Sequence, residues 1–419
     1  METATKTPDQ AKMATQATAN AATAVVATLA VSGQGALSVA AIQPSKAQQQ
    51  LTFYCGSNDG DKGLKLTVSA QKTTLYARQV ESDFGKHYRH WQPLVEISSG
   101  IDADPNCAYW ISIDSLNQQF RYGKGEMRAE TGLLSYGQGA AETYLAPREN
   151  DQPSWLHQIT QVEISSSDPV AITRQWTDPV TIKPPLLVSP INQLRMVDVA
   201  CASKTVAKNL STACQQLYAN ISGRDFTLNT EDFPDFADAI NASINNPNGW
   251  CYQQLARKHQ LSDHQDKNEN YLRITLGQNQ GESPGIPYVM EIWPCQSYSP
   301  IHNHANADAI IRVLDGEINV SLFAMLSAHH QQPFASQSFR RDDITWISAG
   351  LNQTHQLRNL SQERACITIQ CYQYQADNLR HYEYFDYLDD DGKIARFSPD
   401  SDMGFLAFKS KMWLEWQQR

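Results

Sequence analysis

Three histidines, arranged as a close pair and a distant third, constrain this chain more than any other feature of its sequence. His302 and His304 form a His-x-His pair, and residues two apart on a β-strand point to the same face. His355 follows 51 positions after His304, beyond a Leu-Asp-Gly turn at 314–316 and a strand-like run at 318–323. Three neutral imidazoles can hold an iron or zinc ion and leave open positions for chemistry. The sequence therefore predicts a three-histidine metal site carried on strands.

The length and charge of the chain limit its class and its partners. A chain of 419 residues is long for a single domain, so we expect two. The net charge of −10 is spread along the sequence without a basic cluster, which argues against nucleic acid or an anionic membrane as the main partner. No run of about 18 strongly apolar residues is present, so we expect no membrane-spanning helix.

The cysteine pattern bears on the cellular compartment. Eight cysteines are scattered along the chain, with no Cys-x-x-Cys pair and no dense framework of the kind that crosslinks small secreted domains. We expect most of these thiols to be reduced. The expected location is therefore cytoplasmic.

The N-terminal half divides into two parts. Residues 1–50 consist mainly of Ala, Thr, Gln and Ser without any aromatic residue, a composition that predicts a disordered tail. Residues 51–190 contain short alternating runs broken by Gly, Asp, Asn and Pro, which predict a β-sandwich-like domain. We expect this domain to serve in binding or oligomerisation.

The C-terminal domain is expected to cover residues 195–419. Prolines at 184, 185 and 190 predict a linker before it. Apolar spacing predicts helices over about 200–221, 232–244 and 250–259, followed by strands from about 270 to 374. Residues 380–419 are rich in aromatics and are expected to pack over these strands as further strands or an extension.

An ordered series of motifs extends beyond the histidines. It comprises Asn-Pro-Asn-Gly-Trp at 246–250, Tyr-x-Arg at 271–273, Trp293, Pro-Ile-His-Asn-His at 300–304, Leu-Asp-Gly-Glu-Ile at 314–318, His-Gln-Leu-Arg-Asn at 355–359 and Thr-Ile-Gln-Cys-Tyr at 368–372. In this order, residues of about 225–400 resemble the cysteine dioxygenase family, the thiol dioxygenase branch of the cupin superfamily. The resemblance implies a mainly β fold, in which helices precede a cupin barrel (a double-stranded β-helix, or jelly roll).

The resemblance also implies a cofactor and a reaction. Fe(II) would be held by His302, His304 and His355, whose neutral rings leave the ion its full positive charge. L-Cysteine would chelate the iron through its sulfur and amine and leave a position for O2. The implied product is the sulfinic acid, 3-sulfinoalanine, with both oxygen atoms taken from O2.

Three further residues receive roles from the resemblance. Arg273 would bind the substrate carboxylate, since a guanidinium makes two parallel charge-assisted hydrogen bonds. Tyr271, two positions earlier on the same strand face, would add a hydroxyl contact, and Tyr372 would orient the reacting groups as the catalytic tyrosine. Relatives that act on 3-mercaptopropionate carry Gln in place of this Arg, so L-cysteine is favoured over 3-mercaptopropionate.

Two positions depart from the family pattern. Animal members crosslink the catalytic tyrosine to a cysteine, and Ala309 occupies that position here. Gln370 stands where the family usually has a histidine that hydrogen-bonds the tyrosine, and glutamine does not titrate near neutral pH. These departures leave two alternatives open: a dioxygenase for another small thiol acid, or a non-catalytic cupin that binds a metal or ligand.

Overall fold

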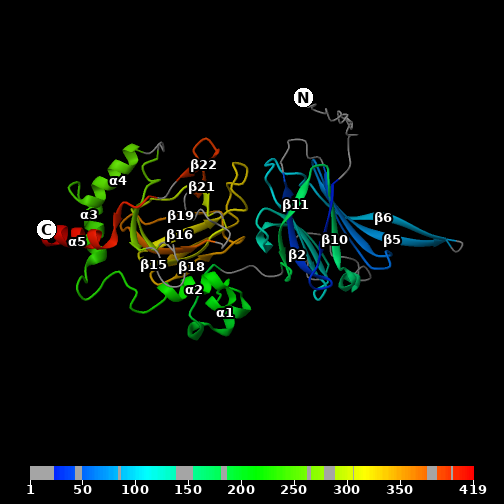
Figure 1. The fold of residues 1–419 in the computed structure, drawn as a ribbon, viewed down its shortest axis with the longest axis horizontal. Coiled ribbons are helices and arrows are strands. Elements are labelled where there is room, and N and C mark those ends of the chain that lie inside the picture. The colour runs from blue at the N-terminus through cyan, green and yellow to red at the C-terminus, as the bar shows by residue number, and fades with distance from the viewer. Residues whose placement is uncertain are drawn as a thin grey trace, which may run out of the picture.

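The computed structural model describes two β-rich bodies that lie side by side, with the N-terminal body at the right and the C-terminal body at the left of Figure 1. It describes residues 23–42, 50–83, 86–137, 154–180, 186–261, 266–277, 288–304, 306–374, 385–397 and 400–419. No helix in this part of the chain combines the length and the apolar character that crossing a membrane requires.

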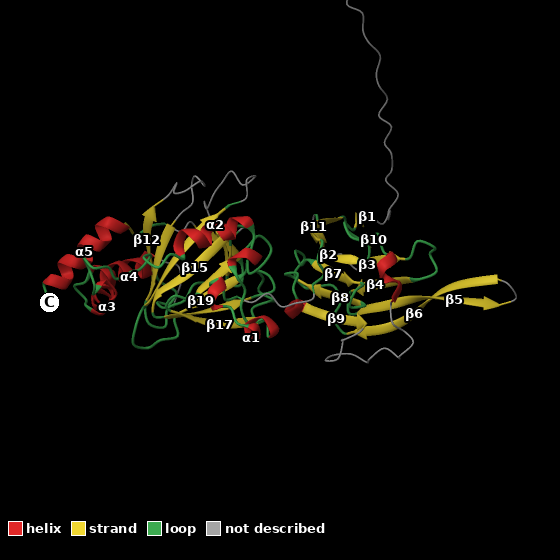
Figure 2. Cartoon of the chain, turned by 90° about the horizontal axis from the view of Figure 1, so that it is seen from below, coloured by secondary structure: helices red, strands yellow, loops and turns green. Residues whose placement is uncertain are grey.

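The described N-terminal residues form two antiparallel sheets. The six-stranded sheet has the order β1 (Thr23–Thr28), β10 (Gln161–Ser166), β3 (Gln50–Gly56), β4 (Gly63–Ser69), β5 (Thr73–Asp83) and β6 (Lys86–Ile97). The five-stranded sheet has the order β11 (Val170–Trp176), β2 (Gln34–Ala41), β7 (Tyr109–Asp114), β8 (Gln119–Lys124) and β9 (Gly132–Gly137). Strands β5 and β6 extend as a hairpin beyond the rest of this body (Figure 2).

Alternating side chains build the core between these sheets. Along β3 and β4, every second residue is buried, as a strand with one covered face requires. Leu51, Phe53, Leu66 and Val68 from one sheet join Ile111 and other residues of the second sheet in a single apolar cluster. The predicted β-sandwich-like fold is confirmed.

The prediction of a disordered tail over residues 1–50 was wrong for residues 23–41. These residues form β1 and β2, and β2 lies between β7 and β11 inside its sheet. Small side chains such as Ala27 and Val39 are buried there, so this segment contributes to the core without aromatic residues. Residues 1–22 and 43–49, and the predicted linker prolines at 184 and 185, lie outside the described residues.

The C-terminal body contains two six-stranded sheets. One has the order β18 (Ile344–Ile347), β15 (Asp308–Asp315), β20 (Cys366–Gln373), β13 (Tyr288–Trp293), β12 (Leu272–Gly277) and β23 (Met403–Gly404). The other has the order β17 (Ala335–Arg340), β16 (Glu317–Leu322), β19 (His355–Arg358), β14 (His302–Asn303), β21 (Phe385–Leu388) and β22 (Ile394–Phe397). Their inner faces share one apolar cluster, and the predicted cupin barrel is confirmed.

The first of these sheets is covered on both faces, which explains why β13 and β15 are buried at every position. On β20, Ile367, Ile369 and Cys371 belong to the cluster that also contains helical residues, whereas Tyr372 belongs to the cluster inside the barrel. The period of two along β20 therefore directs Tyr372 into the barrel and Cys371 out of it.

The C-terminal body contains helices α1 (Met196–Ala200), α2 (Thr212–Ile221), α3 (Phe236–Asn245), α4 (Trp250–Leu261) and α5 (Phe405–Gln417). Helices α3, α4 and α5 lie at the end remote from the N-terminal body, whereas α1 lies on the side toward it (Figures 1 and 2). Helix α2 packs on β15 and β20 of this sheet, and α4 and α5 contact β12. The single helix predicted over 200–221 is shorter than expected, because turns occupy the residues after α1. Ser211 then caps α2 by accepting a hydrogen bond from the Cys214 N–H.

Helix α5 corrects the expectation for residues 380–419. That segment does supply β21, β22 and β23, but it ends in a helix rather than in further strands. Phe408 and Met412, four positions apart, are buried against α3 and α4, which is the spacing of one helix face. The many aromatic residues of the segment are typical of strands, and they obscure the helical spacing of Phe408 and Met412 in the sequence.

Candidate metal centre

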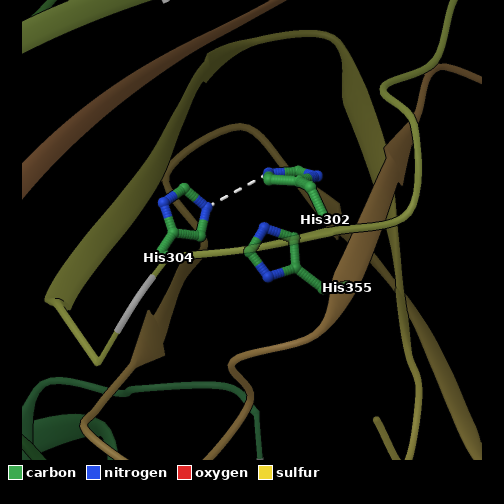
Figure 3. A group of neighbouring side chains, drawn as sticks. All are labelled: His302, His304 and His355. Carbon is green, nitrogen blue, oxygen red and sulfur yellow. Dashed lines mark hydrogen bonds between the residues drawn. The ribbon is translucent and has the colours of Figure 1, made fainter. Parts of the chain in front are cut away.

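Strands β14 and β19 of the barrel bring the three histidines together. His302 begins β14 and lies directly opposite His355, which begins β19, in the antiparallel register. His304 follows the end of β14, and all three side chains are buried. Their ligand nitrogens lie within 4.8 Å of one another, and Figure 3 shows the three rings gathered around one point. The structure thus assembles the cluster that the spacing predicts.

Backbone carbonyls fix the protonation of two of the rings. His302 Nδ1 lies 2.9 Å from the carbonyl oxygen of Pro300, and His355 Nδ1 lies 3.2 Å from that of Asn352. A carbonyl oxygen only accepts, so Nδ1 carries the proton in both rings and Nε2 keeps its lone pair. This arrangement is the one in which a histidine can bind a metal through Nε2.

The nitrogens also fit a metal in their spacing and charge. His304 Nε2 lies 3.1 Å from His302 Nε2, where two lone pairs repel unless a proton or a cation lies between them. Nitrogens that each lie about 2.0–2.1 Å from one ion are separated by about this distance. Burial lowers the pKa of His302 to about 4 and the pKa of His304 and His355 well below the usual range. The donor set is therefore neutral and suits a divalent cation.

A cavity beside His302 and His304 contains the other predicted site residues. Its lining comprises Tyr271, Arg273, Glu291, Trp293, His302, His304, Leu357, Gln370, Tyr372, Phe385 and Phe397. The Tyr372 ring stacks on the His304 ring with 5.2 Å between centroids, and Phe385 meets His304 edge-on at 4.3 Å. Tyr271 stacks on Trp293 at 4.2 Å and makes a side-chain hydrogen bond with Arg273.

A chain of hydrogen bonds crosses this cavity. The Tyr372 hydroxyl donates to Gln370 Oε1, and Gln370 Nε2 donates to Glu291 Oε2. The other carboxylate oxygen of Glu291 accepts from Arg273 Nη1 at 2.9 Å. Gln370 therefore takes over the contact that the family makes to the tyrosine through histidine, and it links the tyrosine to a buried ion pair.

Glu291 is the residue of the site that sequence reasoning missed. It lies in the middle of β13, whose other residues are apolar or aromatic, and it is only 2% exposed. A single carboxylate inside a fully buried strand is costly unless it is paired, and this is the signal that could have identified it. Burial raises the pKa of Glu291 to about 7, although Arg273 and Lys258 oppose this rise.

The comparisons with known proteins agree with these motifs. Residues 252–384 match the family model of cysteine dioxygenase type I. The resemblance is thus confirmed over these residues, which make up less than half of the chain. No curated protein matches the sequence.

Several solved structures are similar to part of the chain. They include the cupin domain of an XRE family transcriptional regulator from Enterobacter cloacae, at 14% identity and a TM-score of 0.20, over 25% of this chain and 97% of that one. The EutQ protein of Clostridium difficile is 16% identical with a TM-score of 0.20, over 28% of this chain and 76% of that one. The Cnp3 cupin domain of Schizosaccharomyces pombe is 11% identical with a TM-score of 0.19, over 25% of this chain and 64% of that one.

Proposed function

We propose that the chain is an Fe(II)-dependent thiol dioxygenase that converts a small thiol into its sulfinic acid. The observation that carries this proposal is the buried cluster of His302, His304 and His355 with the Tyr372 ring stacked on it. The match of residues 252–384 to the cysteine dioxygenase model supports the same reaction class.

Different residues of the chain have different roles around the metal position. Fe(II) bound by the three neutral imidazoles would supply a site at which a thiolate and O2 can combine. Phe385 and Phe397 line the cavity beside it, and their apolar rings would limit the entry of water. Tyr372 would direct its hydroxyl at the reacting sulfur, and Gln370 holds that side chain in place. Overall, one thiol and one O2 give one sulfinic acid, without an external reductant.

The sequence favours L-cysteine as the substrate and 3-sulfinoalanine as the product, because Arg273 could bind a carboxylate. Arg273 is one of the residues that line the cavity beside the histidines. 3-Mercaptopropionate is the alternative among small thiol acids. Oligomerisation through residues 51–190 and a cytoplasmic location stay predictions.

An oxygen-uptake experiment tests the proposed reaction. The protein is loaded anaerobically with Fe(II) and supplied with L-cysteine, 3-mercaptopropionate or 2-aminoethanethiol, and sulfinate formation is followed by mass spectrometry. His304→Ala serves as the blank, because it removes one ligand of the proposed site. Uptake with sulfinate formation, lost in the blank, supports the proposal. Bound iron without uptake on any thiol would assign the barrel to the binding class instead.

A further inference from the structure

The described side chains that line the cavity beside the histidines supply no net positive charge of their own with which to hold a carboxylate. Among the described residues that line it, Arg273 is the only permanent cation, and its guanidinium is paired with Glu291 at 2.9 Å. The nearby Lys258 donates instead to the Tyr271 carbonyl and to Asp402 at 2.7 and 3.0 Å. A substrate carboxylate placed against Arg273 would therefore add a second negative charge beside Glu291.

Such a contact is unfavourable in this surrounding. Arg273 and Glu291 are 7% and 2% exposed, so water screens little of the repulsion between two carboxylates. The Glu291 carboxylate is also held from its other side by Gln370, which keeps it from swinging away. Arg273 Nε is buried without a partner, and its one N–H can be satisfied by a neutral oxygen.

We propose that the Glu291–Arg273 pair makes this site select aminothiols without a free carboxylate, a refinement that rests on the proposed thiol dioxygenase function. The sulfur and the amine of the substrate would both bind the metal. A substrate with a neutral carbonyl group, or with no group at this position, would then be accepted next to the Glu291–Arg273 pair. Glu291 is then the specificity-determining residue, and L-cysteine, which Arg273 by itself would favour, becomes the disfavoured member of the class.

The test compares L-cysteine with L-cysteinamide, which have nearly the same shape and differ in the charge of the carboxyl group. Oxygen uptake by the Fe(II)-loaded protein gives kcat and KM for both, with 2-aminoethanethiol as a third substrate. We expect KM for L-cysteine to exceed that for L-cysteinamide by about tenfold or more. In Glu291→Leu the order should reverse, since Arg273 then becomes free. Glu291→Gln has nearly the same shape as the wild type, and it serves as the second variant if Glu291→Leu does not fold.

A binding measurement separates this inference from the proposed reaction. Anaerobic titration of the Co(II)-substituted protein with each thiol gives dissociation constants from the thiolate-to-cobalt absorption, without turnover. Tighter binding of L-cysteinamide without oxygen uptake would support the selectivity and contradict the dioxygenase. Equal or tighter binding of L-cysteine, unchanged in Glu291→Leu, would overturn the selectivity whatever the turnover.

A second, independent observation concerns the loop that precedes His355. Residues 348–354 contact the N-terminal body. Three side chains of the N-terminal body form hydrogen bonds with these residues. Arg128 Nη1 donates to Asn352 Oδ1 at 2.7 Å, and the Glu126 carboxylate accepts from the backbone N–H groups of Asn352 and Gln353. Arg174 donates to the Ala349 carbonyl at 3.0 Å.

Asn352 connects these contacts to the metal position. Its carbonyl oxygen accepts from His355 Nδ1, and its side chain donates to the Trp346 carbonyl at 3.0 Å. Its backbone adopts the left-handed conformation, with a φ of 62°, which an asparagine tolerates better than most residues. Arg128, only 1% exposed, thus fixes the residue that orients the His355 ring.

We infer that the N-terminal body is a positioning device for His355, acting through Arg128 and Asn352. Partners that orient a ligand are worth about 10- to 100-fold in metal affinity, so a second domain that supplies one becomes part of the metal site. This role is distinct from oligomerisation, because every contact lies within one chain.

Metal affinity of the full-length protein tests this inference. Titration with Co(II) gives its dissociation constant, and thermal unfolding monitors the fold. We expect Arg128→Met to weaken Co(II) binding about tenfold or more, and Arg128→Lys to restore part of it. Arg174→Met, at the edge of the same contact, should have a smaller effect and remains useful if Arg128→Met does not fold. Arg89→Met, on the exposed hairpin, is the matched control.

The outcomes are distinct. A folded Arg128→Met protein that binds Co(II) as tightly as the wild type would overturn the positioning role. Weaker binding in Arg128→Met with unchanged binding in Arg89→Met would support it. Absence of Co(II) binding in the wild type would contradict both this role and the proposed function.

Discussion

Ala309 on β15 faces Tyr372 on β20 as its direct partner in the antiparallel register. Side chains of such partners have Cβ atoms about 4.5–5.5 Å apart. The position that carries the crosslinking cysteine in animal cysteine dioxygenases is therefore next to the tyrosine ring here as well. What this chain lacks is the sulfur and not the geometry, because Cys371 points out of the barrel.

This relationship predicts that Ala309→Cys will form a thioether with Tyr372. During turnover with Fe(II), O2 would oxidise the pair, so that one S–H and one ring C–H bond are replaced by one S–C bond. Mass spectrometry of the tryptic peptides should show a covalently joined pair that has lost two hydrogen atoms. Ala309→Ser is the control of similar size. Separate peptides after prolonged turnover would contradict the expected register.

Gln370 offers a second prediction, because it serves two buried groups at once. In Gln370→Leu, the Tyr372 hydroxyl and the Glu291 carboxylate lose their partner, and the free energy of unfolding should fall by about 1–3 kcal/mol. In Gln370→His, one ring nitrogen can accept from the tyrosine while the other donates to the carboxylate. We expect kcat to fall in the leucine variant and to survive in the histidine variant. Equal kcat in both would show that the tyrosine needs no partner.

The metal cluster could be predicted from sequence because it depends on local rules. The period of two along a strand placed His302 and His304 together, and the motif order placed His355 beside them. Glu291 could not be predicted in the same way, because its meaning depends on Arg273 on β12 and Gln370 on β20, which flank β13 only in the folded sheet. The sequence of one strand does not indicate which other strands will pair with it in the sheet.

Composition does not indicate which segments are buried where packing between strands decides it. The Ala- and Val-rich strands β1 and β2 lack aromatics, yet Ala27, Leu37 and Val39 are buried because neighbouring strands supply the larger side chains. The contact between Arg128 and Asn352 joins residues 224 positions apart, and nothing in either local sequence indicates it. Contacts of this kind follow from the fold and not from a motif.

Helix α5 provides a stability prediction. Phe408 is fully buried and lies 5.4 Å from the Trp250 ring and 6.0 Å from the Phe236 ring, measured between centroids. Phe408→Ala should lower the free energy of unfolding by about 3–5 kcal/mol, through lost burial and the cavity left behind. Urea denaturation followed by tryptophan fluorescence measures this change. Leu406→Ala, on the exposed face of the same helix, should change it by less than about 0.5 kcal/mol.

The buried Glu291 predicts a pH dependence of carboxylate binding. Burial raises the pKa of Glu291 to about 7, so this side chain is ionised above that pH and neutral below it. Arg273 stays charged, because its pKa is also raised, and Gln370 does not titrate. Below about pH 7 the charge of Arg273 is therefore no longer neutralised by Glu291, and a substrate carboxylate can replace the lost partner.

We accordingly expect KM for L-cysteine to fall as the pH decreases from about 8 to about 6. The substrate also titrates in this range, so the quantity to follow is the ratio of KM in the wild type to KM in Glu291→Gln at each pH. Titration of the substrate cancels in this ratio, because both proteins receive the same thiol. The ratio should be largest at high pH and approach one at low pH. A ratio that stays constant with pH would mean that Glu291 keeps one charge state throughout and does not control carboxylate binding by titration.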